Sequence, residues 1–534
     1  MDKYELLHKY FPKVKDFRDV QEETIDSVIN GDNVLCLMLT GGGKSLIYQI
    51  AGLALEKTTI IISPLVALMS QQCRQMTALG LSSVNFSGMD YRKQFRTITD
   101  MANGVLPKFI FTSPERIAND GYLEYLLSLR KDDIGLIVVD EVHCVSQWGE
   151  GFRPAYRSIP TFINSVFGNE WPRVLCLTAT LNNKQQNEVV TNFKITKTVK
   201  GKKLWRENLD LQIINLKDGK EDTKDEELER ILDRHQGEKI LVFAHRVRGN
   251  NGTTRTLYEK YKDIYEGVAY FDADAGDTLK TDVLQGFIDG SIKIVFATSA
   301  FGMGVDIDDI RVVVNYLISE TVEQYYQEVG RGGRDGNQAY GYLLYTNQSK
   351  RGRRFLLNQT LCTETNLMDE WDDRKLNGSD TFNHVTYEDL KEEKKVAFSL
   401  LMDYGVVSVI AKSVRSINCF EGVTLAGKQF LSDLCQYSRA GLVKVIAKKS
   451  GANINTLSLD IWKKCVDGDI KVKSAPGKAV FYTIKKELTE ELAKQIIEDQ
   501  NAKKEERVAA FESFVSGIEK GLTAEQLVKD ALDI

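Results

Sequence analysis

The sequence lacks the signatures of several protein classes. Its eight cysteines form no CxxC pair, which argues against a disulfide framework and against a zinc-binding cysteine module. Its five histidines form no HExxH motif, so a metallohydrolase of that type is disfavoured. No run of about 18 apolar residues indicates a membrane span, and the charged start MDKYELLHKYF contains no signal core. We therefore expect a cytoplasmic globular protein with reduced thiols.

The sequence also lacks a large excess of positive or negative charge. The chain has 70 lysines and arginines against 75 acidic residues, a net charge of −5. There is thus no overall attraction to a polyanion, and any nucleic-acid contact must come from local basic patches. With 534 residues, the chain is long enough for about three domains at roughly 150 residues each.

A glycine-rich segment, LTGGGKS at residues 39–45, directly follows an apolar run and predicts a phosphate-binding loop. In such a loop, backbone N–H groups surround phosphate oxygens, Lys44 reaches the β- and γ-phosphates, and the Ser45 hydroxyl binds magnesium. A glycine-rich turn with a chance lysine is the alternative. The residues expected to hold the phosphates are Thr40, Gly41, Gly42, Gly43, Lys44 and Ser45.

A pair of acidic residues follows a second apolar run, residues 134–139. A buried parallel strand would place Asp140 and Glu141 at the carboxyl edge of a sheet, beside the phosphate loop. We expect Asp140 to hold magnesium and Glu141 to orient or deprotonate the attacking water, with His143 bridging to neighbouring motifs. A solvated turn is the alternative, which the phosphate loop makes less favourable.

The order of short apolar runs predicts an α/β fold with two doubly wound, mostly parallel sheets. The second half has no phosphate loop, which suggests that nucleotide is shared across a cleft. We expect domains at 1–200 and 201–350, a linker around 196–208, and an accessory region at 351–534. The expected strands are 33–38, 59–63, 109–112, 134–140, 174–178, 239–243, 267–271, 293–297, 312–316 and 340–345.

Taken in order, these motifs resemble those of superfamily two helicases, and specifically of the RecQ family of DNA helicases. The phosphate loop matches the family closely, with Leu39 in place of its usual proline. Phe17 and Arg18, followed by Gln21, resemble the family's nucleotide-recognition motif, although Val14 stands where the family has an aromatic residue. The resemblance implies two tandem RecA-like domains that use ATP and Mg²⁺, with Gln21 reading the adenine edge.

Several segments resemble the family's nucleic-acid contacts. SPLVALMSQQ at 63–72 and TSPER at 112–116 resemble strand-contacting motifs, and a capping or turn role is the alternative for each. Residues 144–154 resemble the aromatic-rich loop that couples single-stranded DNA to ATP hydrolysis, with Glu150 and Gly151 replacing the usual histidine and aspartate. The implied contacts are Ser63, Pro64, Ser113, Arg116, Gln147, Trp148, Phe152 and Arg153.

In the second half, residues 297–314 resemble motif five, whose Asp306 is expected to meet the ribose or other motifs. Residues 327–336 resemble motif six, which implies that Gln327, Arg331 and Arg334 complete the ATP site, with Arg334 as the arginine finger. Motif four, at 241–249, departs from the family pattern.

The region 351–534 departs from the family most. Cys419, Cys435 and Cys465 lack the spacing of the family's zinc module, so we predict a variant without structural zinc. A winged-helix fold within 385–486 is compatible with the sequence. The lysines and aromatic residues of 462–486 indicate either a nucleic-acid patch or a solvated face with aromatic anchors.

The resemblance implies an ATP-dependent DNA helicase that moves 3′ to 5′ on single-stranded DNA and unwinds tailed or forked duplexes in repair or recombination. It would act in the nucleoid of a prokaryote or the nucleus of a eukaryote, without a membrane partner. The alternative is a DNA-stimulated ATPase that serves as a translocating or clamping subunit of a DNA-processing or defence complex without robust unwinding. An RNA-dependent ATPase is disfavoured by the aromatic-rich loop.

Overall fold

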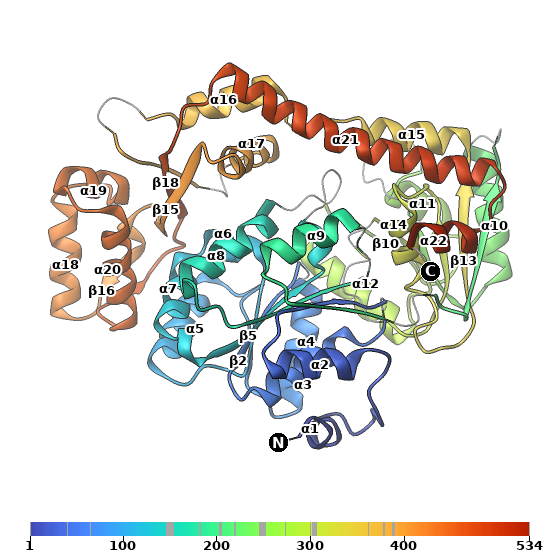
Figure 1. Cartoon of the computed structure of the whole chain (residues 1–534), viewed down its shortest axis with the longest axis horizontal. Helices are drawn as coiled ribbons and strands as arrows, with labels where there is room; N and C mark the ends of the chain where they lie inside the picture. The colour runs from blue at the N-terminus through green and yellow to red at the C-terminus, as the bar shows by residue number, and fades with distance from the viewer. Residues whose placement is uncertain are drawn as a thin grey trace.

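The computed structural model contains two parallel sheets, one in each half of the chain, and a mixed C-terminal region (Figure 1). The predicted α/β fold is confirmed. The structure describes residues 2–39, 41–64, 66–145, 154–179, 181, 183–201, 205–217, 221–244, 252–272, 274–298, 301, 307–360, 362–376, 380–386 and 390–532.

The first sheet has the strand order β3-β4-β2-β5-β6-β1-β7, with every pair parallel. Its central strands are apolar runs that are buried along their whole length, as expected for a sheet covered on both faces. The strands are β1 (Val34–Leu37), β2 (Thr58–Ile62), β3 (Ser83–Asn85), β4 (Phe109–Thr112), β5 (Ile134–Asp140), β6 (Arg173–Thr178) and β7 (Lys197–Lys200).

Helices cover this sheet and follow its strands in alternation. They are α1 (Lys3–Tyr10), α2 (Gln21–Asn30), α3 (Lys44–Ala54), α4 (Val66–Ala78), α5 (Tyr91–Asn103), α6 (Pro114–Asn119), α7 (Gly121–Leu129), α8 (Ser158–Phe167) and α9 (Asn183–Asn192). The linker predicted at 196–208 needs correction, because β7 lies inside it and pairs with β1. Only one residue of this edge strand, Val199, is buried, so its sequence KTVK carries no apolar run.

The second sheet is also parallel, in the order β10-β11-β9-β12-β13-β8. Its strands are β8 (Leu209–Asn215), β9 (Lys239–Phe243), β10 (Val268–Phe271), β11 (Ile294–Ala297), β12 (Ile310–Asn315) and β13 (Ala339–Tyr345). The helices between them are α10 (Glu221–Arg234), α11 (Thr254–Tyr261), α12 (Asp277–Asp289) and α14 (Val322–Val329).

The C-terminal region combines short antiparallel strands with helices. A three-stranded sheet has the order β14-β18-β15, and β16 pairs with β17. The strands are β14 (Asn383–Val385), β15 (Val407–Val414), β16 (Phe420–Gly422), β17 (Ile470–Val472) and β18 (Lys478–Ile484). The helices are α15 (Asn347–Leu357), α16 (Glu364–Arg374), α17 (Glu392–Asp403), α18 (Leu425–Cys435), α19 (Val443–Ser450), α20 (Ile454–Val466), α21 (Glu490–Glu519) and α22 (Ala524–Leu532).

This region packs against the first domain through buried aromatic side chains. The ring of Trp462, on α20, stacks on Tyr122 of α7 with centroids 5.2 Å apart, and its Nε1 donates to the Lys412 carbonyl at 3.2 Å. Trp462, Phe481 and Tyr482 are at most 4% exposed. A nucleic-acid patch built on these three aromatics is therefore wrong, because their rings belong to the core.

Helix α21 links the C-terminal region back to the second domain. It runs along one side of the molecule, beside α15 and α16, and ends near α22 (Figure 1). Phe511, Phe514 and Ile518 enter the core of the second domain, while Lys184 of the first domain forms an ion pair with Glu506 at 2.7 Å. The accessory region thus contacts both domains.

Candidate nucleotide-binding and hydrolysis site

The phosphate loop connects β1 to the first turn of α3. Gly41 and Gly43 have φ angles of 78° and 81°, values that favour glycine, and Gly43 caps the helix in the left-handed conformation. The Nζ atom of Lys44 is buried and has no hydrogen-bond partner among the described residues. A buried ammonium group without a partner is costly, so this position suits an anion such as a nucleotide phosphate.

Gln21 ties the nucleotide-recognition segment to this loop. Its Oε1 accepts from the Arg18 backbone N–H at 2.8 Å, and its Nε2 donates to the carbonyls of Gly42 and Gly43 at 2.9 and 3.1 Å. The Gln21 amide, which the family resemblance assigns to the adenine edge, is therefore hydrogen-bonded to the phosphate loop in this structure. Phe17 is half-buried and lies 5.1 Å from the ring of Tyr4.

The acidic pair lies at the carboxyl end of β5. The two oxygens of Asp140 accept from the Ser63 hydroxyl at 3.2 Å and from the Glu141 backbone N–H at 3.0 Å. Glu141 has a φ of 51°, which is uncommon outside glycine and is typical of functional positions. The Ser45 hydroxyl and the Asp140 carboxylate are oxygen donors of the kind that Mg²⁺ prefers, so these residues fit the ion.

Burial and neighbouring charges shift the pKa values of the two carboxyl groups in opposite directions. Burial and the nearby Glu141 raise the pKa of Asp140 above its usual range. Burial also opposes ionisation of Glu141, but Lys44 and His143 outweigh it and lower the pKa of Glu141 below its usual range. Glu141 is consequently ionised at neutral pH, the state required to orient water or accept its proton.

His143 joins this pair to the end of β6. Its Nδ1 lies 3.2 Å from Glu141 Oε2 and 3.0 Å from Thr178 Oγ1. Burial disfavours the charged ring, but the adjacent Cys144 and Glu141 raise the pKa of His143 to about 10.

The second domain brings two arginines to the same place. The side chain of Arg334 packs on the phosphate loop, since a Cβ atom added to Gly41 would lie 2.9 Å from Arg334 Cγ. Burial and the charge of Arg334 lower the pKa of Arg331 to about 9, while nearby Glu141 partly opposes the shift. Both arginines therefore lie within reach of the phosphate loop and the acidic pair, and Gln327 lies half-buried on α14.

Two predicted DNA contacts occupy buried positions instead. Arg116 is 8% exposed, and its Nη2 lies 2.6 Å from Asp120 Oδ2. Ser63 is 1% exposed, and its hydroxyl donates to Asp140. Both side chains therefore have buried protein partners in this structure, and their contact with DNA stays a prediction.

The other predicted contacts fall into two groups. Pro64 is buried, and Ser113 caps α6 by accepting from the Arg116 backbone N–H at 3.3 Å. The remaining predicted site residues lie outside the described residues; they are Thr40, Gln147, Trp148, Phe152, Arg153 and Asp306.

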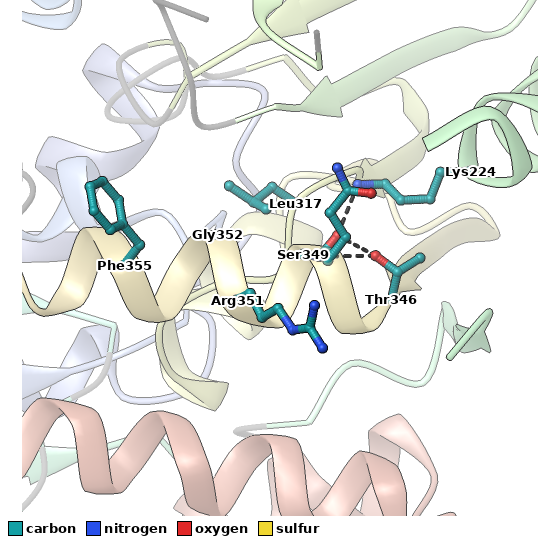
Figure 2. A pocket seen from close by; sticks show the side chains of 8 residues that line it. Lys224, Leu317, Thr346, Ser349, Arg351, Gly352 and Phe355 are labelled. Atoms are coloured by element: carbon teal, nitrogen blue, oxygen red, sulfur yellow. Dashed lines mark hydrogen bonds between the residues drawn. The ribbon is translucent and has the colours of Figure 1, made fainter. Parts of the chain in front are cut away.

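A surface pocket on α15 lies apart from this site (Figure 2). Lys224 Nζ donates to Ser349 Oγ at 2.9 Å, and that hydroxyl also contacts Thr346 Oγ1 at 3.0 Å. Arg351 and Phe355, which are both exposed, also line this pocket. The pocket contains none of the predicted site residues.

Comparison with known proteins agrees with this arrangement. The family model described as DEAD/DEAH box helicase matches residues 18–189, and the helicase conserved C-terminal domain matches 223–336. Two solved structures share the fold at 16% identity. A DEAD-box helicase bound to ssRNA and UDP-BeF has a TM-score of 0.53, covering 69% of this chain and 82% of that one. The DUF1998 helicase MrfA bound to DNA also scores 0.53, covering 67% and 54%.

The chain is similar to several curated proteins. ATP-dependent DNA helicase RecQ of Bacillus subtilis is 32% identical over 360 residues, which cover 66% of this chain and 58% of that protein. A putative ATP-dependent RNA helicase of Acanthamoeba polyphaga mimivirus is 34% identical over 381 residues, covering 67% and 66%. The probable ATP-dependent DNA helicase RecS of Bacillus subtilis is 32% identical over 332 residues, covering 61% and 64%.

The two sheets, the phosphate loop and the paired helicase domains define a protein of the DEAD/DEAH-box helicase class. Within that class, the curated proteins to which the chain is similar include RecQ DNA helicases, at 29 to 32% identity. The chain spans 58 to 66% of the length of the three curated relatives described above. Among the described residues, no helix has the length and apolar character needed to cross a bilayer.

Proposed function

We propose that this protein is an ATP-dependent DNA helicase that moves 3′ to 5′ on single-stranded DNA and couples ATP hydrolysis to duplex unwinding. The observation that carries the proposal is the packing of Arg334, from the second domain, on the phosphate loop of the first. A site assembled from two domains responds to their closure, which is how hydrolysis can drive movement along a strand.

Each residue of this site has a distinct part in the proposed reaction. Water attacks the γ-phosphorus, the bond to the β–γ bridging oxygen breaks, and ADP and phosphate leave. Glu141 orients the water and accepts its proton. Lys44 neutralises the phosphates, and Arg331 and Arg334 stabilise the charge of the transition state. Mg²⁺, held by Ser45 and Asp140, would supply further positive charge to the phosphate oxygens when bound.

The DNA substrate is the second part of the proposal. The names of the Bacillus subtilis relatives support DNA, and the family resemblance supports the 3′ to 5′ direction and a place in repair or recombination. The proposed division is 1–200 and 201–350 for the two helicase domains and 351–534 for the accessory region. We propose a zinc-free accessory region and tailed or forked duplexes as substrates, and action in the nucleoid or nucleus.

One observation favours a second candidate function. The accessory region packs on the first domain, and α21 enters the core of the second. Such a connection restrains how far the domains separate, which suits a DNA-stimulated ATPase that clamps or translocates without robust unwinding.

A strand-displacement assay with 3′-tailed and 5′-tailed duplexes separates these functions. The helicase proposal predicts that ATP opens only the 3′-tailed duplex and that Lys44→Ala abolishes opening. ATP turnover that single-stranded DNA stimulates, without opening of either duplex, would establish the clamp. Turnover stimulated by RNA but not by DNA would overturn the substrate assignment.

A further inference from the structure

The loop that carries both arginines, residues 330–334 (the finger loop), is held by a side chain from the segment between the two sheets. Arg206 Nη1 donates to the Gly330 carbonyl at 2.9 Å, and Nη2 donates to the Gly333 carbonyl. Its backbone N–H donates to the Tyr326 hydroxyl on α14 at 3.1 Å. One guanidinium group thus binds carbonyls near both ends of the finger loop.

Asn208 adds a second attachment at the end of the same loop. Its Nδ2 donates to the carbonyls of Gly333 and Asn337, both at 2.7 Å. Gly333 has a φ of 57°, and an added Cβ atom would lie 2.6 Å from Asn208 Nδ2. The finger loop therefore approaches this segment so closely that only glycine fits.

The segment itself is fixed by aromatic packing. The Trp205 ring lies parallel to that of Tyr326, with centroids 5.6 Å apart and an interplanar angle of 2°. Lys529 of α22 lies 5.6 Å from the Trp205 ring centroid. Burial and the charge of Arg334 lower the pKa of Arg206, which places the two guanidinium groups in the same electrostatic environment. Holding two like charges this close requires fixed partners, which the loop carbonyls supply to Arg206.

We propose that Arg206 and Asn208 are positioning residues that fix the finger loop so that Arg331 and Arg334 point at the γ-phosphate. This inference rests on the proposed ATPase function and deepens it. Because preorganised charge acts on the transition state, losing the attachment should lower kcat. ATP affinity should persist, because Lys44 and Gln21 belong to the other domain.

The test is a double-variant cycle on the full chain, with steady-state ATP turnover, ATP affinity and thermal unfolding measured together. Arg206→Gln and Asn208→Ala are each expected to lower kcat by about 10- to 100-fold, in line with the effect of small misplacements. The Kd for ATP should change less than about twofold. Arg206→Gln combined with Arg334→Ala should lose much less than the product of the two single losses, because Arg206 acts through Arg331 and Arg334.

Matched variants separate positioning from a general loss of structure. Arg230→Gln removes an exposed arginine of the same domain, paired with Glu227, and should leave kcat unchanged. Arg206→Lys retains the charge and can reach one carbonyl, so its kcat should lie between those of the wild type and Arg206→Gln. If Arg206→Gln does not fold, Arg206→Lys takes its place in the cycle.

If the unaltered chain hydrolyses ATP, two results would overturn this inference without overturning the proposed function. One is a double variant whose loss equals the product of the two single losses. The other is a rise in the ATP Kd without a fall in kcat. If the unaltered chain shows no ATP turnover with single-stranded DNA, the proposed function fails and the inference fails with it.

Discussion

The buried ion pair between Arg116 and Asp120 gives a prediction whose size follows from the structure. Asp120 is 6% exposed, its Oδ2 lies 2.6 Å from Arg116 Nη2, and its Oδ1 accepts from the Leu123 backbone N–H at 3.0 Å. Burial alone would raise the pKa of Asp120, but Arg116 and Lys478 lower it from 3.8 to about 2. This difference corresponds to about 2 kcal/mol of folding free energy.

The perturbation is Asp120→Asn, which keeps the side-chain shape and removes the charge. We expect the variant to lose about 2 kcal/mol at neutral pH, and up to about 5 kcal/mol if Arg116 is left buried without a counter-charge. At roughly 2 to 4 °C per kcal/mol, Tm should fall by about 4 to 20 °C. The measurement is thermal unfolding followed by circular dichroism.

The direction of the pKa shift determines how the stabilisation by Asp120 depends on pH. Because the pKa of Asp120 is lower in the folded state, its contribution is fully present above about pH 4 and disappears as the pH falls towards 2. The difference in Tm between the wild type and Asp120→Asn should therefore be the same at pH 6 as at pH 8, and it should become smaller below pH 4. Asp133→Asn, in the exposed pair with Arg130, is the control and should cost less than about 1 kcal/mol.

The competing interpretation assigns Arg116 to DNA phosphate. Under that interpretation, Arg116→Ala lowers the affinity for single-stranded DNA while Tm stays unchanged, and Asp120→Asn leaves Tm unchanged. Observing both would refute the structural role of the ion pair.

The remaining predictions concern the accessory region and the ATP site. Trp462→Ala should destabilise the protein by about 3 to 5 kcal/mol in denaturant unfolding, with a smaller loss for Trp462→Phe; unchanged stability with weaker DNA binding would contradict the core position. Glu141→Gln should abolish ATP turnover but keep nucleotide binding, as measured by titration with a fluorescent ATP analogue. Because the pKa of Asp140 is raised, its protonation at acidic pH should raise the Mg²⁺ concentration needed for half-maximal turnover, whereas an unchanged requirement would exclude Asp140 as the ligand. Elemental analysis should find no stoichiometric zinc.

The features predicted best from the sequence are those that depend on local patterns of residues. The expected strands at 134–140 and 239–243 coincide with β5 and β9, because central parallel strands are buried on both faces and read as apolar runs. The edge strand β7 was missed because just one of its side chains is buried. The order of the motifs similarly predicted the composite site, since the ends of parallel strands meet at one edge of a sheet.

The parts that the sequence did not predict depend on partners distant in the chain. Trp462 is buried against Tyr122, more than 300 residues earlier, and no local pattern distinguishes it from an exposed aromatic. Arg206 bonds to Gly333 across a separation of 127 residues, outside any motif. Arg116 lies within a motif that resembles a DNA contact, and its partner Asp120 also lies 3.4 Å from Lys478, more than 350 residues later in the accessory region.

In the proposed mechanism, the second domain completes the ATP site of the first by contributing Arg334. Its contribution is measured by single-turnover hydrolysis of ATP with single-stranded DNA, comparing the unaltered chain with Arg334→Ala. We expect the hydrolysis rate to fall by about 10³-fold or more with ATP binding retained. An unchanged hydrolysis rate in Arg334→Ala would show that the second domain does not complete the site through this residue.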